Sequence, residues 1–82
     1  MGLVKVMRIY LNTYSNINNL VEKLRNYCEK LHVIKSSVVP AFIFLELWSP
    51  RIDTKEVREV IAKYVDLSDI IRIDLVEVKV KE

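Results

Sequence analysis

The sequence predicts an α+β protein of the ferredoxin-like βαββαβ type, a two-layer sandwich with two helices on one face of a four-stranded antiparallel sheet. Four segments rich in β-branched and aromatic residues are interleaved with two segments whose apolar residues recur at helical spacing. The connections between these segments are short, as a split βαβ arrangement requires. With 82 residues the chain has room for one hydrophobic core, so residues 1–82 are expected to form a single domain.

The first half of the chain predicts a strand, a helix and a second strand. Residues 3–11 are β-branched and aromatic, and they are followed by polar residues in which Ser15 or Asn16 is a fair N-cap. Apolar residues recur every three or four positions over 17–31, which predicts an amphipathic helix of about four turns. Residues 32–38 suit a short second strand.

The second half repeats the pattern. Pro40 places the start of a third strand, AFIFLELW, near Ala41. Asp53 and Glu56 have the spacing of a capping box, and a second helix follows. The buried stripe of this helix is expected to be Val57, Val60, Ile61, Tyr64 and Val65. Residues 66–69 form a loop before a final strand over 70–82.

Side chains alternate between the two faces of a strand, so parity assigns each residue to a face. The aliphatic series is expected to meet the helices: Met7, Ile9, Leu11, Ala41, Ile43, Leu45, Leu47, Ile71, Ile73 and Leu75. The other series is expected on the uncovered face: Val6, Arg8, Tyr10, Asn12, Phe42, Phe44, Glu46, Trp48, Arg72 and Asp74. Monomers seldom expose an apolar patch above a few hundred Å². This face is therefore predicted to have a partner.

The alternation in the last strand changes phase near Leu75 and Val76, where Val76, Val78 and Val80 become the apolar series. Either a β-bulge intervenes, or the last half-strand overhangs the sheet and packs against something else. In the second case the terminal valines extend the uncovered face.

No set of residues predicts catalysis or a cofactor. Cys28 falls on the apolar stripe of the first helix, and His32 is expected to interact with that helix's C-terminus. No Cys/His cluster has metal-ligand spacing, and the sole glycine, Gly2, leaves no phosphate-binding loop. The nearest carboxylate cluster is Asp66, Asp69 and Asp74, which we interpret as solvated charges.

Composition bears on location and partners. Thirteen basic and eleven acidic residues give a net charge of +2, which supplies no strong attraction to nucleic acid or to anionic lipid. The apolar segments are too short and too often charged for a membrane span, and a single cysteine fits a reducing cytoplasm. Abundant Val, Ile, Lys and Glu with no glutamine is typical of heat-adapted proteins.

Two strand motifs resemble those of RNA recognition motif domains. Ile9-Tyr10-Leu11-Asn12 resembles their first-strand motif, and residues 41–47 resemble their third-strand motif, although Pro40-Ala41 stand where the family has a basic residue and a glycine. The resemblance implies that Tyr10, Phe42 and Phe44 stack on RNA bases.

Residues 41–80 also look similar to the second half of the RAM domain of Lrp-type regulators. That family is ferredoxin-like, associates through its sheets and binds amino acids between subunits. Here Val38-Val39-Pro40-Ala41 replace its Gly-x-Tyr-Asp, so the resemblance implies oligomer formation more than ligand binding.

Three hypotheses follow. The favoured one is a non-enzymatic assembly module, a homo-oligomer or a subunit bound to another protein, with Arg8, Glu46, Arg72 and Asp74 setting the register through ion pairs. The second is an RNA-binding module with Arg8 and Arg72 as flanking cations. The third is an enzyme or metal-dependent nuclease that uses the three aspartates. The predicted interaction residues are Val6, Arg8, Tyr10, Phe42, Phe44, Glu46, Trp48, Arg72, Val76 and Val78.

Overall fold

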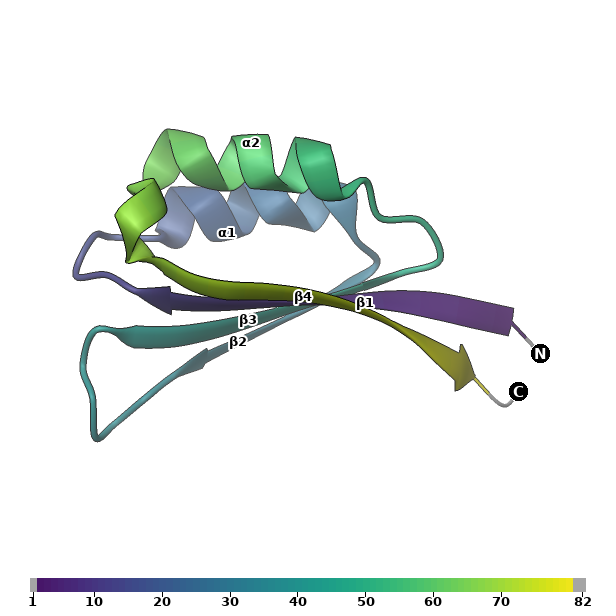
Figure 1. Ribbon diagram of the computed structural model, residues 1–82, viewed down its shortest axis with the longest axis horizontal. Helices are drawn as coiled ribbons and strands as arrows, with labels where there is room; N and C mark the ends of the chain where they lie inside the picture. Colours follow the sequence, from purple (N-terminus) through teal and green to yellow (C-terminus); the bar gives the residue numbers. More distant parts are fainter. Residues whose placement is uncertain (1, 81–82) are drawn as a thin grey trace.

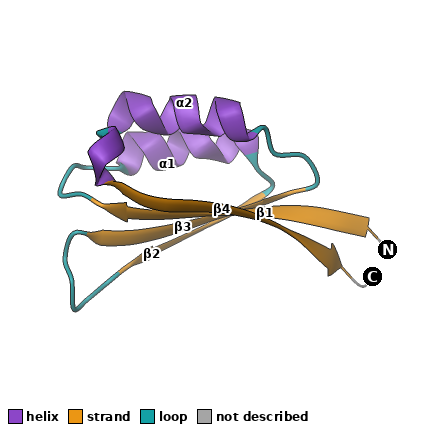
Figure 2. Ribbon diagram, in the orientation of Figure 1, coloured by secondary structure: helices purple, strands orange, loops and turns teal. Residues whose placement is uncertain are grey.

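The computed structural model describes residues 2–80, which form two layers (Figure 1). The sheet consists of β1 (Gly2–Asn12), β2 (Lys30–Lys35), β3 (Phe42–Ser49) and β4 (Ile70–Val80). The helices are α1 (Asn18–Leu24) and α2 (Thr54–Tyr64), with short 3-10 turns η1 (Arg25–Tyr27) and η2 (Leu67–Asp69). Both helices lie over the same face of the sheet, and within residues 2–80 no helix covers the other face (Figures 1 and 2).

The strand order is β2-β3-β1-β4, and every neighbouring pair is antiparallel. The predicted α+β class, with a four-stranded antiparallel sheet and two helices, is therefore confirmed. The register places Ile9 opposite Leu45 on one side and opposite Ile73 on the other. Because directly opposed residues project to the same face, this register assigns the side chains of the sheet to the two faces.

The core lies between the sheet and the helices. Alternate residues of the two central strands point into it, and all of them are at most 4% exposed: Met7, Ile9, Leu11, Ile43, Leu45 and Leu47. Leu20 and Leu24 of α1 and Val57, Val60 and Ile61 of α2 close the other side. The predicted parity of the first and third strands is confirmed, and each buried aliphatic side chain contributes about 1.5–3 kcal/mol of hydrophobic free energy.

The start of α2 follows its predicted cap. The Asp53 carboxylate accepts a hydrogen bond from the Glu56 backbone N–H at 3.2 Å. This bond satisfies one of the N–H groups that a helix leaves unpaired at its first turn. At 11 residues α2 is the longest helix described, and none over residues 2–80 has the length and apolar character needed to cross a membrane.

The predicted four-turn first helix is wrong. The α1 helix ends at Leu24, one 3-10 turn follows, and Cys28 is extended with φ −151° and ψ 161°. The second strand consequently begins at Lys30 and ends at Lys35, ahead of the predicted 32–38. Pairing with β3 explains the difference, because the Glu29 N–H donates to the Trp48 carbonyl at 2.8 Å and Leu31 lies opposite Leu47. Leu31 thereby enters the core from a strand.

The last strand corrects two further predictions. Tyr10 pairs with Arg72 but Leu11 pairs with Ile70, so Ile71 is the extra residue of a β-bulge. Ile71 was expected to point inward and is instead 57% exposed, while Ile70 packs against the core. A bulge near Leu75 and Val76 is absent, because pairing with β1 continues without a break from Arg72 to Val80. Leu75 lies on the helix-facing side but is 43% exposed there. The apolar residues that follow it, Val76 and Val78, lie on the opposite face of the sheet.

The two longest strands extend beyond the rest of the sheet. Pairing between β1 and β3 ends at Lys5 with Ser49, so residues 2–4 pair only with residues 78–80. This β1–β4 ribbon projects past the helices (Figure 1, right). The overhang considered for the last strand is therefore a paired ribbon up to Val80, and residues 81–82 of the predicted strand lie outside the described residues.

Candidate functional site

The face of the sheet that turns away from the helices is named the open face. Its residues are Val4, Val6, Arg8, Tyr10 and Asn12 of β1, Lys30, His32 and Ile34 of β2, Phe42, Phe44, Glu46 and Trp48 of β3, and Arg72, Asp74, Val76 and Val78 of β4. All ten residues predicted to interact with a partner lie on it. Sequence reasoning missed the contribution of β2, because the predicted helix covered its first residues.

Three aromatic rings gather at one end of the open face. The Tyr10 ring lies 5.0 Å from the Phe44 ring and 6.4 Å from the Phe42 ring, measured between centroids. Both pairs are tilted, by 43° and 36°, a geometry that aromatic side chains favour. Ile34, opposite Phe44 on the edge strand, is 57% exposed and extends this apolar zone, which is named the ring cluster.

A row of polar side chains crosses the middle of the open face. The register places His32 opposite Glu46, Glu46 opposite Arg8, and Arg8 opposite Asp74. This charged row contributes one side chain from each of the four strands. The Arg8 Nε donates to Glu46 Oε2 at 3.1 Å, with 40% of the arginine side chain and 18% of the glutamate side chain exposed.

Glu46 also holds the tryptophan. The Trp48 indole Nε1–H donates to Glu46 Oε1 at 2.7 Å, so one carboxylate bridges an indole and a guanidinium through its two oxygens. Trp48 lies opposite Val6, and Val6 lies opposite Val76. Val6 is 0% exposed although it belongs to the open face, so its side chain has no accessible surface in the single chain, and its contact with a partner stays a prediction.

The second arginine of the open face is paired along its own strand. Arg72 Nε donates to Asp74 Oδ1 at 2.9 Å. This hydrogen bond and the charge of Asp74 raise the pKa of Arg72 above its ordinary value, so the guanidinium stays protonated. Both arginines of the open face therefore have a carboxylate partner within the same face.

His32 and Cys28 lie elsewhere than predicted. His32 belongs to β2, on the open face opposite Glu46, and not at a helix end. Cys28 follows η1 in extended conformation, partly buried, and its thiol donates to the Leu24 carbonyl with 3.4 Å between sulfur and oxygen. Burial raises the pKa of this thiol, while the nearby Arg25 opposes the shift. A thiol that keeps its proton is a poor nucleophile.

The three aspartates considered as a metal site are distributed over two structural elements. Asp69 ends η2 and Asp66 precedes it, whereas Asp74 lies on the open face and pairs with Arg72. Over residues 2–80, no three or more His, Cys, Asp or Glu side chains come together in a way that could hold a metal ion.

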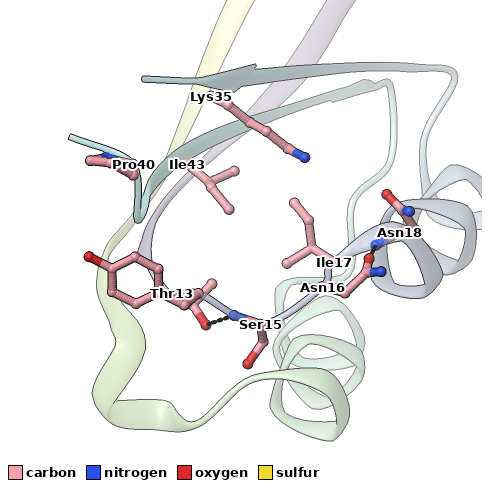
Figure 3. Close-up of a pocket in the computed structure, with 9 residues that line it drawn as sticks. Thr13, Ser15, Asn16, Ile17, Asn18, Lys35, Pro40 and Ile43 are labelled. Atoms are coloured by element: carbon pink, nitrogen blue, oxygen red, sulfur yellow. Dashed lines mark hydrogen bonds between the residues drawn. The ribbon is translucent and has the colours of Figure 1, made fainter. Parts of the chain in front are cut away.

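A pocket of about 290 Å³ lies beside the start of α1, between the loops that follow β1 and β2 (Figure 3). Two of its polar side chains are engaged locally: Thr13 Oγ1 accepts from the Ser15 N–H at 3.1 Å, and Asn16 Oδ1 accepts from the Asn18 N–H at 2.9 Å. The Lys35 amine points toward it, and its lining includes no carboxylate, cysteine or histidine.

A second pocket, also of about 290 Å³, opens at the tryptophan end of the open face. Val4, Glu29, Lys30 and Trp48 line it, and apolar surface predominates. It lies where β3 has ended and β1 continues into the ribbon. The ribbon and this pocket are thus neighbours at one end of the sheet.

Comparison with protein-family models, with curated proteins and with solved structures gave no match to the chain. The resemblances to RNA recognition motif and RAM domains accordingly stay predictions from strand motifs.

Proposed function

We propose that the chain is a non-enzymatic assembly module whose open face is a protein–protein interface. The observation that carries this proposal is the composition of that face: the ring cluster lies at one end, Trp48 and the valines of β4 lie at the other, and internally paired charges lie between them. Interfaces commonly enrich aromatic residues and arginine in this way.

The size of the open face suits a stable contact. Four strands about 4.8 Å apart and a central strand of eight residues rising about 3.3 Å each outline an area of about 500 Å². Covering this area on both partners removes on the order of 1,000 Å² from water, which is the lower limit for specific association. The β1–β4 ribbon adds to the area.

The charges of the open face also favour a protein partner. Burying an unpaired charge is costly, but Arg8 is already bonded to Glu46 and Arg72 to Asp74. A partner that covers these pairs removes water from charges whose main hydrogen bonds are in place. The pairs therefore lower the cost of covering the middle of the sheet.

An RNA-binding module is the second candidate, and the ring cluster is the observation that favours it. Tyr10 lies on β1 and Phe42 and Phe44 on β3, so adjacent strands offer neighbouring rings, each able to contribute about 1–3 kcal/mol by stacking on a base. Phosphate contact requires cations, however, and both arginines of the open face are engaged by carboxylates. The protein interface is therefore the better-supported proposal.

Solution mass tests the proposal. Sedimentation velocity or light scattering from about 1 to 100 μM, a range that spans typical weak and moderate dissociation constants, is expected to show a concentration-dependent rise above 9.7 kDa. A monomer at all concentrations that binds single-stranded RNA, more weakly as salt rises, supports the second candidate instead. A monomer that binds no RNA leaves only a different protein as the partner.

The proposal includes the ferredoxin-like topology, one domain over residues 1–82 and a cytoplasmic location. The element order β1-α1-β2-β3-α2-β4 and the central position of β1 and β3 support the topology. Cross-strand NOEs from Met7 to Leu47 and to Leu75 test it, since only a central β1 gives both sets. The location rests on the single cysteine.

A further inference from the structure

The charged row has an order that complements its own reverse. From β2 to β4 it reads His32, Glu46, Arg8, Asp74, so a cationic or N–H-donating side chain alternates with a carboxylate. When this order is reversed about the line midway between β3 and β1, each position that held a base or donor holds a carboxylate. A second row placed in that reversed order meets every carboxylate with a donor.

From this order we infer that the partner of the open face is a second copy of the chain, packed face to face about a two-fold axis parallel to the strands and midway between β1 and β3. The inference rests on the proposed function and names its partner. A two-fold axis in this direction places β1 of one subunit over β3 of the other and β2 over β4. Residues that are opposite each other within one sheet stay at the same height along the strands. Arg8 then faces Glu46 of the partner subunit, and His32 faces Asp74 of the partner subunit.

The same axis brings the apolar zones together. Phe44 faces Tyr10 of the partner subunit, so the two ring clusters merge into one aromatic layer. At the other end, the register places Trp48 opposite the position of Val6 of the partner subunit, whose own side chain has no accessible surface. Sheets packed face to face lie about 10 Å apart with their strands crossing at about 30°, a spacing that these rings fill.

Other two-fold arrangements of the same faces place like groups together. An axis along the charged row puts Glu46 against Glu46 of the partner subunit and Arg8 against Arg8 of the partner subunit, which costs several kcal/mol per like-charge contact. An axis perpendicular to the strands that passes midway between the charged row and the row of Tyr10 and Phe44 puts these charges against the ring cluster. There the charges lose water without gaining a partner. Of these three axes, only the one parallel to the strands pairs opposite charges along the charged row and also places Phe44 against Tyr10 of the partner subunit.

The β1–β4 ribbon provides an independent reason for this axis. At the level of the ribbon, β3 has ended and the pocket lined by Val4, Glu29, Lys30 and Trp48 lies beside it. Because the axis places β4 of one subunit over β2 of the other at the same height along the strands, Val78 of the partner subunit lies over that pocket. The projection on each subunit thus covers the hollow on the other, and both copies of the pocket are covered.

Site-directed cross-linking tests the pairing. In one chain, His32 and Asp74 lie on the two edge strands, about 14 Å apart at three strand spacings, whereas facing residues of packed sheets are about 10 Å apart. In a Cys28→Ser background, a bis-maleimide too short to span the sheet is expected to convert the His32→Cys/Asp74→Cys variant to a covalent dimer. The matched single variants His32→Cys and Asp74→Cys are expected to stay monomeric on a denaturing gel.

Two outcomes overturn the inference and leave the proposed function intact. Cross-linking of His32→Cys alone indicates an axis along the charged row. An assembly that is stable by sedimentation, that Phe44→Ala weakens and that none of the variants cross-links uses the open face about another axis. A wild-type chain that stays monomeric overturns the inference and leaves the proposed function only with a different protein as the partner.

Charge exchange provides a second measurement. Arg8→Glu and Glu46→Arg each put four like charges at the centre of a homodimer, and each is expected to weaken association at least 100-fold. Mixed together, the two variants place two glutamates against two arginines, and the dimer is expected to return near the wild-type affinity. Circular dichroism of each variant alone verifies its fold, and failure of the mixture to associate refutes the pairing.

Discussion

Adjacent residues of β3 separate the stability of the fold from that of the assembly. Phe44 points to the open face and lies 5.0 Å from Tyr10, whereas Leu45 is 0% exposed in the core between sheet and helices. Truncating each to alanine removes apolar atoms from the same strand, one position apart, on opposite sides. The two variants are therefore matched controls for each other.

Phe44→Ala is expected to weaken association by at least about 2 kcal/mol, close to 30-fold in the dissociation constant, as loss of a buried aromatic anchor does. The same change removes its packing with Tyr10, which is worth about 0.5–1.5 kcal/mol of unfolding free energy. Leu45→Ala is expected to cost about 2–5 kcal/mol of unfolding free energy through the cavity that it leaves. Where it remains folded, its dissociation constant should stay near the wild-type value.

The assay combines sedimentation equilibrium with urea unfolding at a protein concentration below the dissociation range, because association itself stabilises the folded chain. If Phe44→Ala leaves the solution mass unchanged and lowers the unfolding free energy by about 3–5 kcal/mol, then Phe44 belongs to the core. That result would reverse the assignment of the faces and remove the basis for the interface.

Three further predictions concern single residues. Glu46→Ala should shift the Trp48 indole N–H resonance and lower the unfolding free energy by about 1–2 kcal/mol, because the Arg8 guanidinium and the Trp48 indole both lose the largely buried carboxylate that accepts from them. Glu22→Ala, whose 3.8 Å contact is on the surface, should cost less than about 0.5 kcal/mol, and equal losses would contradict this. Cys28 should react with iodoacetamide several-fold more slowly in the native than in the urea-unfolded chain at neutral pH. Since the native thiol keeps its proton where the unfolded one loses it, unfolding free energy should fall as pH rises above the ordinary thiol pKa, and a Cys28→Ser chain that shows the same slope would refute the assignment. Asp53→Ala should cost about 1 kcal/mol of unfolding free energy without changing the dissociation constant, and a change in solution mass would contradict its purely local role.

The faces of the central strands could be predicted from the sequence because their two residue series differ in chemistry. Ile43, Leu45 and Leu47 are aliphatic, whereas Phe42 and Phe44 are aromatic, so parity alone separated core from surface. The capping carboxylate of α2 was predictable for a similar reason, since the bond between Asp53 and Glu56 is local.

The boundary between α1 and β2 could not be predicted because its residues fit both patterns. Cys28 and Leu31 continue the helical spacing of the preceding residues, whereas Leu31 and Val33 alternate with polar neighbours as a strand does. Pairing with β3 decides between the two, and such pairing is a long-range contact that the local sequence does not contain. The same reason conceals the bulge at Ile71, since a run of two isoleucines gives no sign of which one faces the core.

The bond from the Trp48 indole to Glu46 has a consequence for the thermodynamics of association. A large side chain that is free to rotate loses about 0.5–1.5 kcal/mol of conformational entropy when a partner immobilises it. The indole N–H of Trp48 donates at 2.7 Å to the Glu46 carboxylate, which also accepts from Arg8. The ring has therefore already lost most of this rotational freedom in the isolated subunit. The entropic cost of ordering this ring is met when the chain folds, so we expect association through the proposed interface to require little rearrangement of Trp48.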